Sequence, residues 1–242
     1  MSALPLVLLH GWGAHAGVWG DVIARMDLGH TVIAPDYPAE GGVDRSMNEV
    51  VDRLAAMVPE RCVVAGWSLG GQLALQWAQR YPRRIRKLIL VSTTPRFVMA
   101  PDWSYGMDAD AFSSFAGLVA TDAAQALRRF LLLETQGDAQ ARKVARQLEA
   151  ALGARPDAEG PALMRTLDWL RDTDLRTVLH DIVQPVLVMH GDCDRITPFA
   201  AGEFLAARLA DARLVRISGA AHAPFVSDPE AFSRLIAEFC NE

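Results

Sequence analysis

The sequence predicts an α/β fold with a mostly parallel sheet flanked by helices and interrupted by a helical insertion. Short apolar segments rich in Val, Ile and Leu alternate with longer amphipathic segments near both ends of the chain. The apolar segments are apolar throughout, which is typical of parallel strands covered on both faces. Between about residues 97 and 184 we find only helical patterns. A helical segment therefore interrupts one α/β domain.

Four predicted strands precede the insertion. They comprise residues 6–9, 31–34, 62–65 and 85–91. Helices are expected at residues 16–26, at residues 47–57 and from just after Ser68 to about Arg80. In the first helix the residues expected to face inward are Val18, Trp19, Val22, Ile23 and Met26.

The insertion and the part of the chain that follows it complete the predicted order. Helices of the insertion are expected at residues 108–119, 123–135, 139–152 and 161–170. A strand at 185–189, a helix at 199–209, a strand at 213–217 and a helix at 229–239 then resume the alternation. We therefore divide the chain into a core of residues 1–96 and 185–242 and an insertion of residues 97–184.

Composition excludes several classes of protein. A net charge of -5 over 242 residues gives no reason to expect a nucleic-acid partner. Three widely spaced cysteines form neither a disulfide framework nor a zinc pattern, which suits a reducing cytoplasm. The apolar start lacks the basic and small residues of a signal peptide, and no apolar run is long enough to span a bilayer. We expect a cytoplasmic monomer that needs no metal or cofactor.

A Gly-x-Ser-x-Gly pattern lies between the third strand and the helix after it. Gly66 and Gly70 flank Ser68, and an apolar strand ends where the pattern begins. This arrangement predicts a sharp turn that exposes the serine oxygen at the carboxyl edge of the sheet. The turn also places the serine near the positive end of a helix. We therefore predict that Ser68 is a nucleophile, although an incidental serine in a glycine-rich turn is the alternative.

A serine nucleophile needs a base and an acidic residue that orients the base. His222 follows the last strand and precedes the last helix, so it lies at the same edge as Ser68. His10 and His190 are weaker candidates for the base. The acid should lie between serine and histidine in chain order. We predict that Asp194 orients the base, with Asp192 as the second candidate. The alternative is that these two aspartates only form a turn.

An ester-cleaving site also needs two backbone N–H donors for the oxyanion. One is expected from Leu69, the residue after the nucleophile. The other is expected from Trp12, which lies between two glycines after the first strand. We also expect Trp12 and Trp67 to form walls of the substrate pocket and apolar residues of the insertion to roof it.

The insertion carries positive charge in an acidic chain. Residues 125–147 contain five basic and two acidic side chains. Arg142 and Arg146 are four residues apart, so they share one helix face. Such a patch could attract an acidic partner, whereas an ordinary solvated helix is an equally good interpretation.

With Ser68, Asp194 and His222 in that order, the chain resembles the α/β-hydrolases, with the insertion as a helical lid. It most resembles the pimeloyl-[acyl-carrier protein] methyl ester esterases of biotin synthesis. Four motifs carry this resemblance: Leu8–Gly13, Gly66–Gly71, Phe130–Gly137 and His222–Phe225.

The resemblance implies hydrolysis of a methyl ester on a pimeloyl chain held by acyl carrier protein. It implies that Phe130 helps to bind the substrate and that Arg129, Arg142 and Arg146 dock the acidic carrier. A further family arginine position is Gln125 here. The contributions of Arg128 and Lys143 to docking stay open.

Other functions remain compatible with the residues alone. A general short-acyl carboxylesterase, lactonase or thioesterase would use the same three side chains, and so would an acyltransferase that excludes water. A slow-turnover small-molecule receptor is a candidate from a different class.

Overall fold

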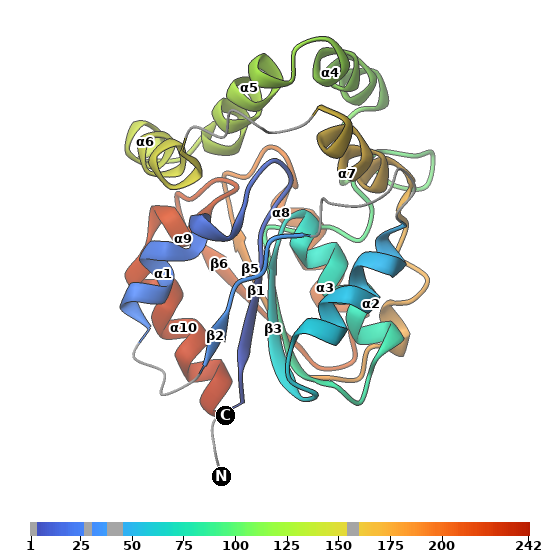
Figure 1. Cartoon of the computed structure of the whole chain (residues 1–242), viewed down its shortest axis with the longest axis vertical. Helices are drawn as coiled ribbons and strands as arrows, with labels where there is room; N and C mark the ends of the chain where they lie inside the picture. Colours follow the sequence, from blue (N-terminus) through green and yellow to red (C-terminus); the bar gives the residue numbers. More distant parts are fainter. Residues whose placement is uncertain (1–3, 27–30, 38–45, 154–159) are drawn as a thin grey trace.

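A parallel sheet runs through the centre of the protein (Figure 1). The computed structural model describes residues 4–26, 31–37, 46–153 and 160–242. Its six strands lie in the order β2-β1-β3-β4-β5-β6, and each neighbouring pair is parallel. The strands are β1 (Leu6–Leu9), β2 (Val32–Ile33), β3 (Cys62–Trp67), β4 (Ile85–Val91), β5 (Val186–Gly191) and β6 (Ala212–Ile217).

Helices cover both faces of the sheet. One face carries α1 (Gly20–Arg25) and α10 (Pro229–Asn241), which contact each other. The other face carries α2 (Met47–Met57), α3 (Leu69–Arg80) and α8 (Phe199–Arg208). The three-layer arrangement predicted from the continuous apolar strands is confirmed.

Strands β1, β3 and β5 are buried on both sides because two separate clusters of side chains enclose the sheet. In β1, Val7 and Leu9 join the cluster that contains α2 and α3, whereas Leu6 and Leu8 join the cluster that contains α1 and α10. Successive side chains of a strand point to opposite faces, so every position is buried. Each such side chain contributes about 1.5–3 kcal/mol of hydrophobic stabilisation.

The first predicted helix differs from the observed one. Residues Ala16–Trp19 form a 3-10 turn, and only then does α1 begin. A 3-10 turn has fewer residues per turn than an α-helix, so the phase of the inward face changes across the junction. The inward prediction for Ile23 is wrong, because this side chain is exposed. In addition, β2 is shorter than expected, and the short helix α9 (Pro224–Ser227) was not predicted.

Between β4 and β5, the described residues form four α-helices that lie together above the carboxyl ends of the strands (Figure 1, top). They are α4 (Ala109–Thr121), α5 (Ala123–Thr135), α6 (Ala141–Leu152) and α7 (Gly160–Asp172). Asp108 and Asp122 cap α4 and α5 by accepting hydrogen bonds from backbone N–H groups of the first turns. No helix in the described ranges has both the length and the apolar character that a membrane crossing requires.

Candidate active site

Ser68 occupies a strained turn between β3 and α3. Its φ is 54°, a left-handed value that is uncommon for a residue with a side chain. The turn is possible because Gly66 and Gly70 have no Cβ. A Cβ on Gly66 would lie 2.1 Å from the Gly70 carbonyl oxygen, and one on Gly70 would lie 2.3 Å from the Leu9 carbonyl oxygen. Both glycines of the pattern are therefore required by contacts between backbone segments.

His222 is paired with Asp194. His222 Nδ1 lies 2.8 Å from Asp194 Oδ2, and both side chains are fully buried. The second oxygen, Asp194 Oδ1, accepts hydrogen bonds from the backbone N–H groups of Ile196 and Thr197 at 2.9 and 3.0 Å. Burial alone would raise the pKa of Asp194, but the neighbouring His222 and His190 outweigh it and hold that pKa well below its usual value. The acid is therefore ionised at neutral pH.

Asp192, the reserve candidate for the acid, has a different partner. Its Oδ1 accepts a hydrogen bond from the Gly219 N–H at 2.7 Å. Asp194 is therefore the aspartate that contacts His222, whereas Asp192 binds the turn that follows β6.

Two hydrogen bonds fix the backbone of His222. Its N–H donates to the Glu134 carbonyl oxygen at 3.0 Å, and its carbonyl oxygen accepts from Trp67 Nε1 at 2.7 Å. On the ring, Nε2 is buried and has no hydrogen-bond partner in the described part of the chain. Because Nδ1 donates to a carboxylate, Nε2 carries the lone pair and can accept a proton.

Thr197 and His190 complete the surroundings of the acid. Thr197 Oγ1 lies 2.8 Å from Asp194 Oδ2 and 3.1 Å from the Ser92 carbonyl oxygen. His190 Nε2 lies 2.7 Å from the Thr197 carbonyl oxygen and 3.5 Å from Asp194 Oδ2, the same oxygen that contacts His222. Sequence reasoning missed Thr197. Its spacing three residues after an aspartate is the only local signal.

The loop after β1 places Trp12 beside the helices of the insertion. Trp12 Nε1 donates to the Leu163 carbonyl oxygen of α7 at 3.0 Å. The indole ring makes edge-to-face contacts with Phe115 and Phe130, at centroid distances of 5.4 and 4.9 Å. At the same edge of the sheet, Leu69 is the first residue of α3, where a helix leaves its N–H groups without internal acceptors.

Trp67 does not form a pocket wall, so that prediction is wrong. The ring is fully buried in the cluster on the α1 and α10 face, at 5.0 Å from the Phe225 ring. Trp67 is the last residue of β3, where the alternation of side chains turns it away from the α3 face. Its indole N–H holds the His222 carbonyl instead.

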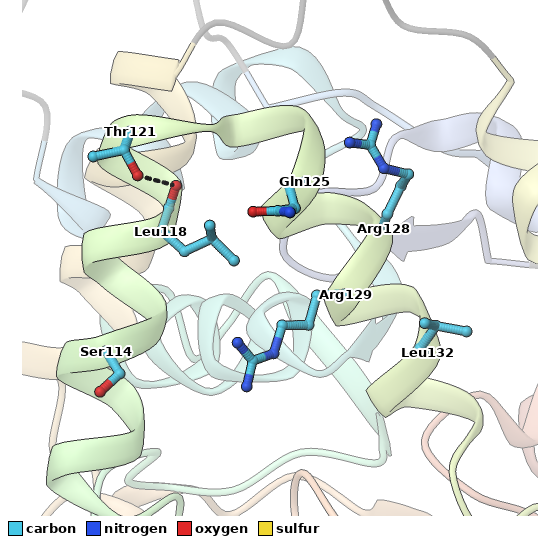
Figure 2. A pocket seen from close by; sticks show the side chains of 7 residues that line it. All are labelled: Ser114, Leu118, Thr121, Gln125, Arg128, Arg129 and Leu132. Atoms are coloured by element: carbon cyan, nitrogen blue, oxygen red, sulfur yellow. Dashed lines mark hydrogen bonds between the residues drawn. The ribbon is translucent and has the colours of Figure 1, made fainter.

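The predicted docking arginines lie on α5 and α6. A hollow of about 740 Å³ opens between α4 and α5, and Arg129 extends into it (Figure 2). Gln125 and Arg128 also line this hollow. Arg142 and Arg146 are exposed on α6.

A family model supports the fold. Residues 6–235 match the model described as "Alpha/beta hydrolase family". The chain belongs to this family. A solved structure of an esterase from Exiguobacterium antarcticum superposes on this hydrolase with a TM-score of 0.86 at 23% identity, covering 100% of this chain and 93% of that one.

Curated relatives confirm the narrower resemblance. A protein from Aromatoleum aromaticum named "Pimeloyl-[acyl-carrier protein] methyl ester esterase" is 41% identical to this hydrolase over 98% of each chain. A protein of the same name from Nitrosospira multiformis is 37% identical over 97% of this chain and 93% of its own. No three described His, Cys, Asp or Glu side chains of the hydrolase are grouped so as to hold a metal ion.

Proposed function

We propose that this hydrolase cleaves the methyl ester of a pimeloyl chain carried by acyl carrier protein. The products are pimeloyl-acyl carrier protein, with a free carboxylate, and methanol. The near full-length similarity to relatives with this name supports the substrate and the place in biotin synthesis. The observation that carries the chemistry is the buried pair of His222 and Asp194 at the sheet edge where Ser68 begins α3.

The proposed reaction is a two-step acyl transfer to water. His222 Nε2 takes the proton of Ser68 Oγ while the oxygen attacks the ester carbonyl. Asp194 holds the ring in the tautomer that this step needs and stabilises the imidazolium that forms. Methanol then leaves with the proton from His222. Water activated by the same ring hydrolyses the acyl-enzyme and regenerates Ser68.

Two backbone amides are proposed to stabilise the tetrahedral intermediate. The Leu69 N–H points from the first turn of α3, where the helix dipole also favours negative charge. The Trp12 N–H is the second donor, and the contacts of its ring with α7 and Phe130 fix the loop that carries it. Each such donor contributes about 10²- to 10³-fold to kcat. Phe130 is proposed to contact the acyl chain beside Trp12.

Residues 97–184 are proposed to act as a lid that also docks the carrier. Arg129, Arg142 and Arg146 are exposed and have no acidic partner in the described part of the chain. Exposed arginines of this kind attract an acidic protein and raise its association rate. Gln125 removes one positive charge from the hollow that Arg129 shares. We propose that the enzyme works as a monomer in the cytoplasm.

The test compares two substrates. Purified enzyme is incubated with methyl-pimeloyl acyl carrier protein and, separately, with a short p-nitrophenyl ester, at increasing salt concentration. We expect repeated turnover of the carrier substrate with release of free acid, at a rate that falls as salt screens the arginines. Activity on the short ester alone would indicate a general carboxylesterase. Single-turnover behaviour would indicate a receptor, and transfer of the acyl group to another acceptor would indicate an acyltransferase.

A further inference from the structure

A short segment of the lid is bound to the loop that carries His222. Residues 134–140, which comprise the end of α5 and the connection to α6, run beside residues 219–222. His222 N–H donates to the Glu134 carbonyl oxygen at 3.0 Å, and Ala139 N–H donates to the Gly219 carbonyl oxygen at 2.8 Å. The position of the base is therefore tied to the lid as well as to the core.

Asp138 lies at the centre of this contact. The residue is buried, with 8% of its surface exposed. Asp138 Oδ2 accepts a hydrogen bond from the backbone N–H of Ala221, the residue before the base, at 3.0 Å. The same oxygen accepts from the hydroxyl of Ser227, at the end of α9. One carboxylate oxygen thus joins the two sides of the loop that holds His222.

The other carboxylate oxygen of Asp138 binds the backbone at the start of α6. Asp138 Oδ1 accepts from the Gln140 N–H at 2.7 Å, and α6 begins at the next residue. Gln140 in turn donates from Nε2 to the Ser227 carbonyl oxygen at 3.3 Å. The helix that bears Arg142 and Arg146 is consequently connected to the loop of the base through one buried side chain.

We propose that Asp138 is a positioning residue for His222, acting through Ala221 and Ser227. This inference rests on the proposed role of His222 as the base at Ser68. Without the carboxylate, the Ala221 N–H loses its acceptor and the loop can shift relative to Asp194 and Ser68. Misplacement of a reacting group by about 1 Å can cost on the order of 10²-fold in rate.

Asp138 acts by geometry, because its contacts are hydrogen bonds to neutral groups. An asparagine can keep the two contacts to the loop of the base. With its amide oxygen in the place of Oδ2, it can accept from both the Ala221 N–H and the Ser227 hydroxyl, and only the contact of Oδ1 with the Gln140 N–H is lost. Asp138→Asn should therefore rescue what Asp138→Ala loses.

The experiment measures kcat and KM on a short p-nitrophenyl ester, together with the melting temperature of each variant. Asp138→Ala is expected to lower kcat by about 10- to 100-fold and to leave KM within about threefold of the wild-type value. Asp138→Asn should return kcat to within about fivefold of wild type. The matched control is Asp122→Ala, which removes a lid carboxylate that caps α5 at its other end. It should keep kcat within about twofold.

Three results would overturn the proposal: an Asp138→Ala kcat like that of the control, a loss confined to KM, or an Asn variant as impaired as the Ala variant. If Asp138→Ala does not fold, Ser227→Ala decides, because it removes the hydroxyl and leaves the carboxylate. A fall in its kcat of about fivefold or more supports the proposal, and an unchanged kcat overturns it. Because the short ester needs no carrier, failure of the carrier substrate alone would refute the proposed function without affecting this test. An enzyme inactive on both substrates would refute both.

Discussion

Two aspartates only two residues apart have different partners, and this difference is testable. Asp194 contacts His222, whereas Asp192 contacts the Gly219 N–H. We expect Asp194→Asn to lower kcat on the order of 10³- to 10⁴-fold, because an amide does not hold the required tautomer of the base. Steady-state kinetics on a short ester measure the effect.

Asp192→Asn is the matched control, since it changes the same chemical group at the neighbouring turn. It should keep kcat within about tenfold of wild type. Equal losses in the two variants would refute the assignment of Asp194 as the orienting acid.

Glu134 is a buried carboxyl close to the site. Burial first, and the Asp194 carboxylate second, raise the pKa of Glu134 well above its usual value. A glutamate with a raised pKa ionises less readily in the folded protein than in the unfolded chain. The folded state is therefore destabilised as pH rises from about 4.3, the unfolded pKa, towards the raised pKa.

Glu134→Gln removes this ionisation at nearly constant shape. We expect the melting temperature of the variant at pH 8 to lie a few degrees above that of wild type. For a chain of this size, about 1 kcal/mol in the free energy of unfolding corresponds to about 2–4 °C. The difference should shrink as pH falls to about 3, where the glutamate is protonated in both states. Thermal melts across this range measure it, and a gain in stability that is independent of pH would contradict the explanation.

Sequence reasoning predicted Ser68 and His222 as site residues for a physical reason. The glycines around Ser68 are required by backbone contacts within one short turn, so the turn is visible as a local pattern. Thr197 and Asp138 left no comparable signal. Asp138 acts on Ala221, which is 83 residues away in the chain, and no local periodicity encodes such a contact.

At the scale of single elements, we expect substitution by alanine to have opposite effects on stability at two glycines in different surroundings. Gly66 lies where a Cβ would meet backbone at 2.1 Å, whereas Gly117 in α4 has open space around the Cβ position. Gly66→Ala should cost about 3 kcal/mol or more in the free energy of unfolding, or prevent folding. Gly117→Ala should add about 0.5–1 kcal/mol, because alanine favours a helix interior over glycine.

Urea denaturation of both glycine variants measures these changes. Destabilisation by Gly117→Ala, or a neutral effect of Gly66→Ala, would contradict the packing described for the turn at Ser68.

The exposed arginines of α6 are expected to affect binding of the carrier substrate. Arg142→Glu combined with Arg146→Glu reverses two exposed charges. We expect KM for methyl-pimeloyl acyl carrier protein to rise by about tenfold or more, while kcat/KM for the short ester stays within about twofold. Salt-dependent kinetics on both substrates measure the effect.

The control for this pair is Arg53→Glu combined with Arg61→Glu, which changes net charge equally at exposed positions outside the lid. Equal losses for the two pairs would indicate a general effect of charge and remove the docking hypothesis.

Element types were predictable where one physical signal dominates. Strands buried on both faces are continuously apolar, and the helices α4 and α5 of the insertion carry amphipathic patterns with clear caps. The 3-10 turn before α1 was not predicted, because its four residues fit the helical pattern equally well. For this reason the predicted inward face of the first helix includes Ile23, whose side chain is exposed in the structure.

At the scale of the whole molecule, the parallel sheet brings distant segments to one edge. The segments after β1, β3, β5 and β6 carry Trp12, Ser68, Asp194 and His222. That convergence follows from strand direction alone, so the sequence predicts it. The attachment of the inserted helices to the core does not follow in this way. It depends on single contacts, such as that of Trp12 Nε1 with the Leu163 carbonyl and that of Glu134 with the His222 backbone.

Ser68 of this hydrolase is proposed to demethylate the carrier-bound pimeloyl chain. The most direct measurement is the intact mass of methyl-pimeloyl acyl carrier protein after incubation with wild type or with Ser68→Ala. Wild type should convert the carrier to a species lighter by one methylene, and Ser68→Ala should slow that conversion on the order of 10⁴-fold or more. An unchanged mass with wild type, or conversion by Ser68→Ala at the wild-type rate, would contradict this role of Ser68.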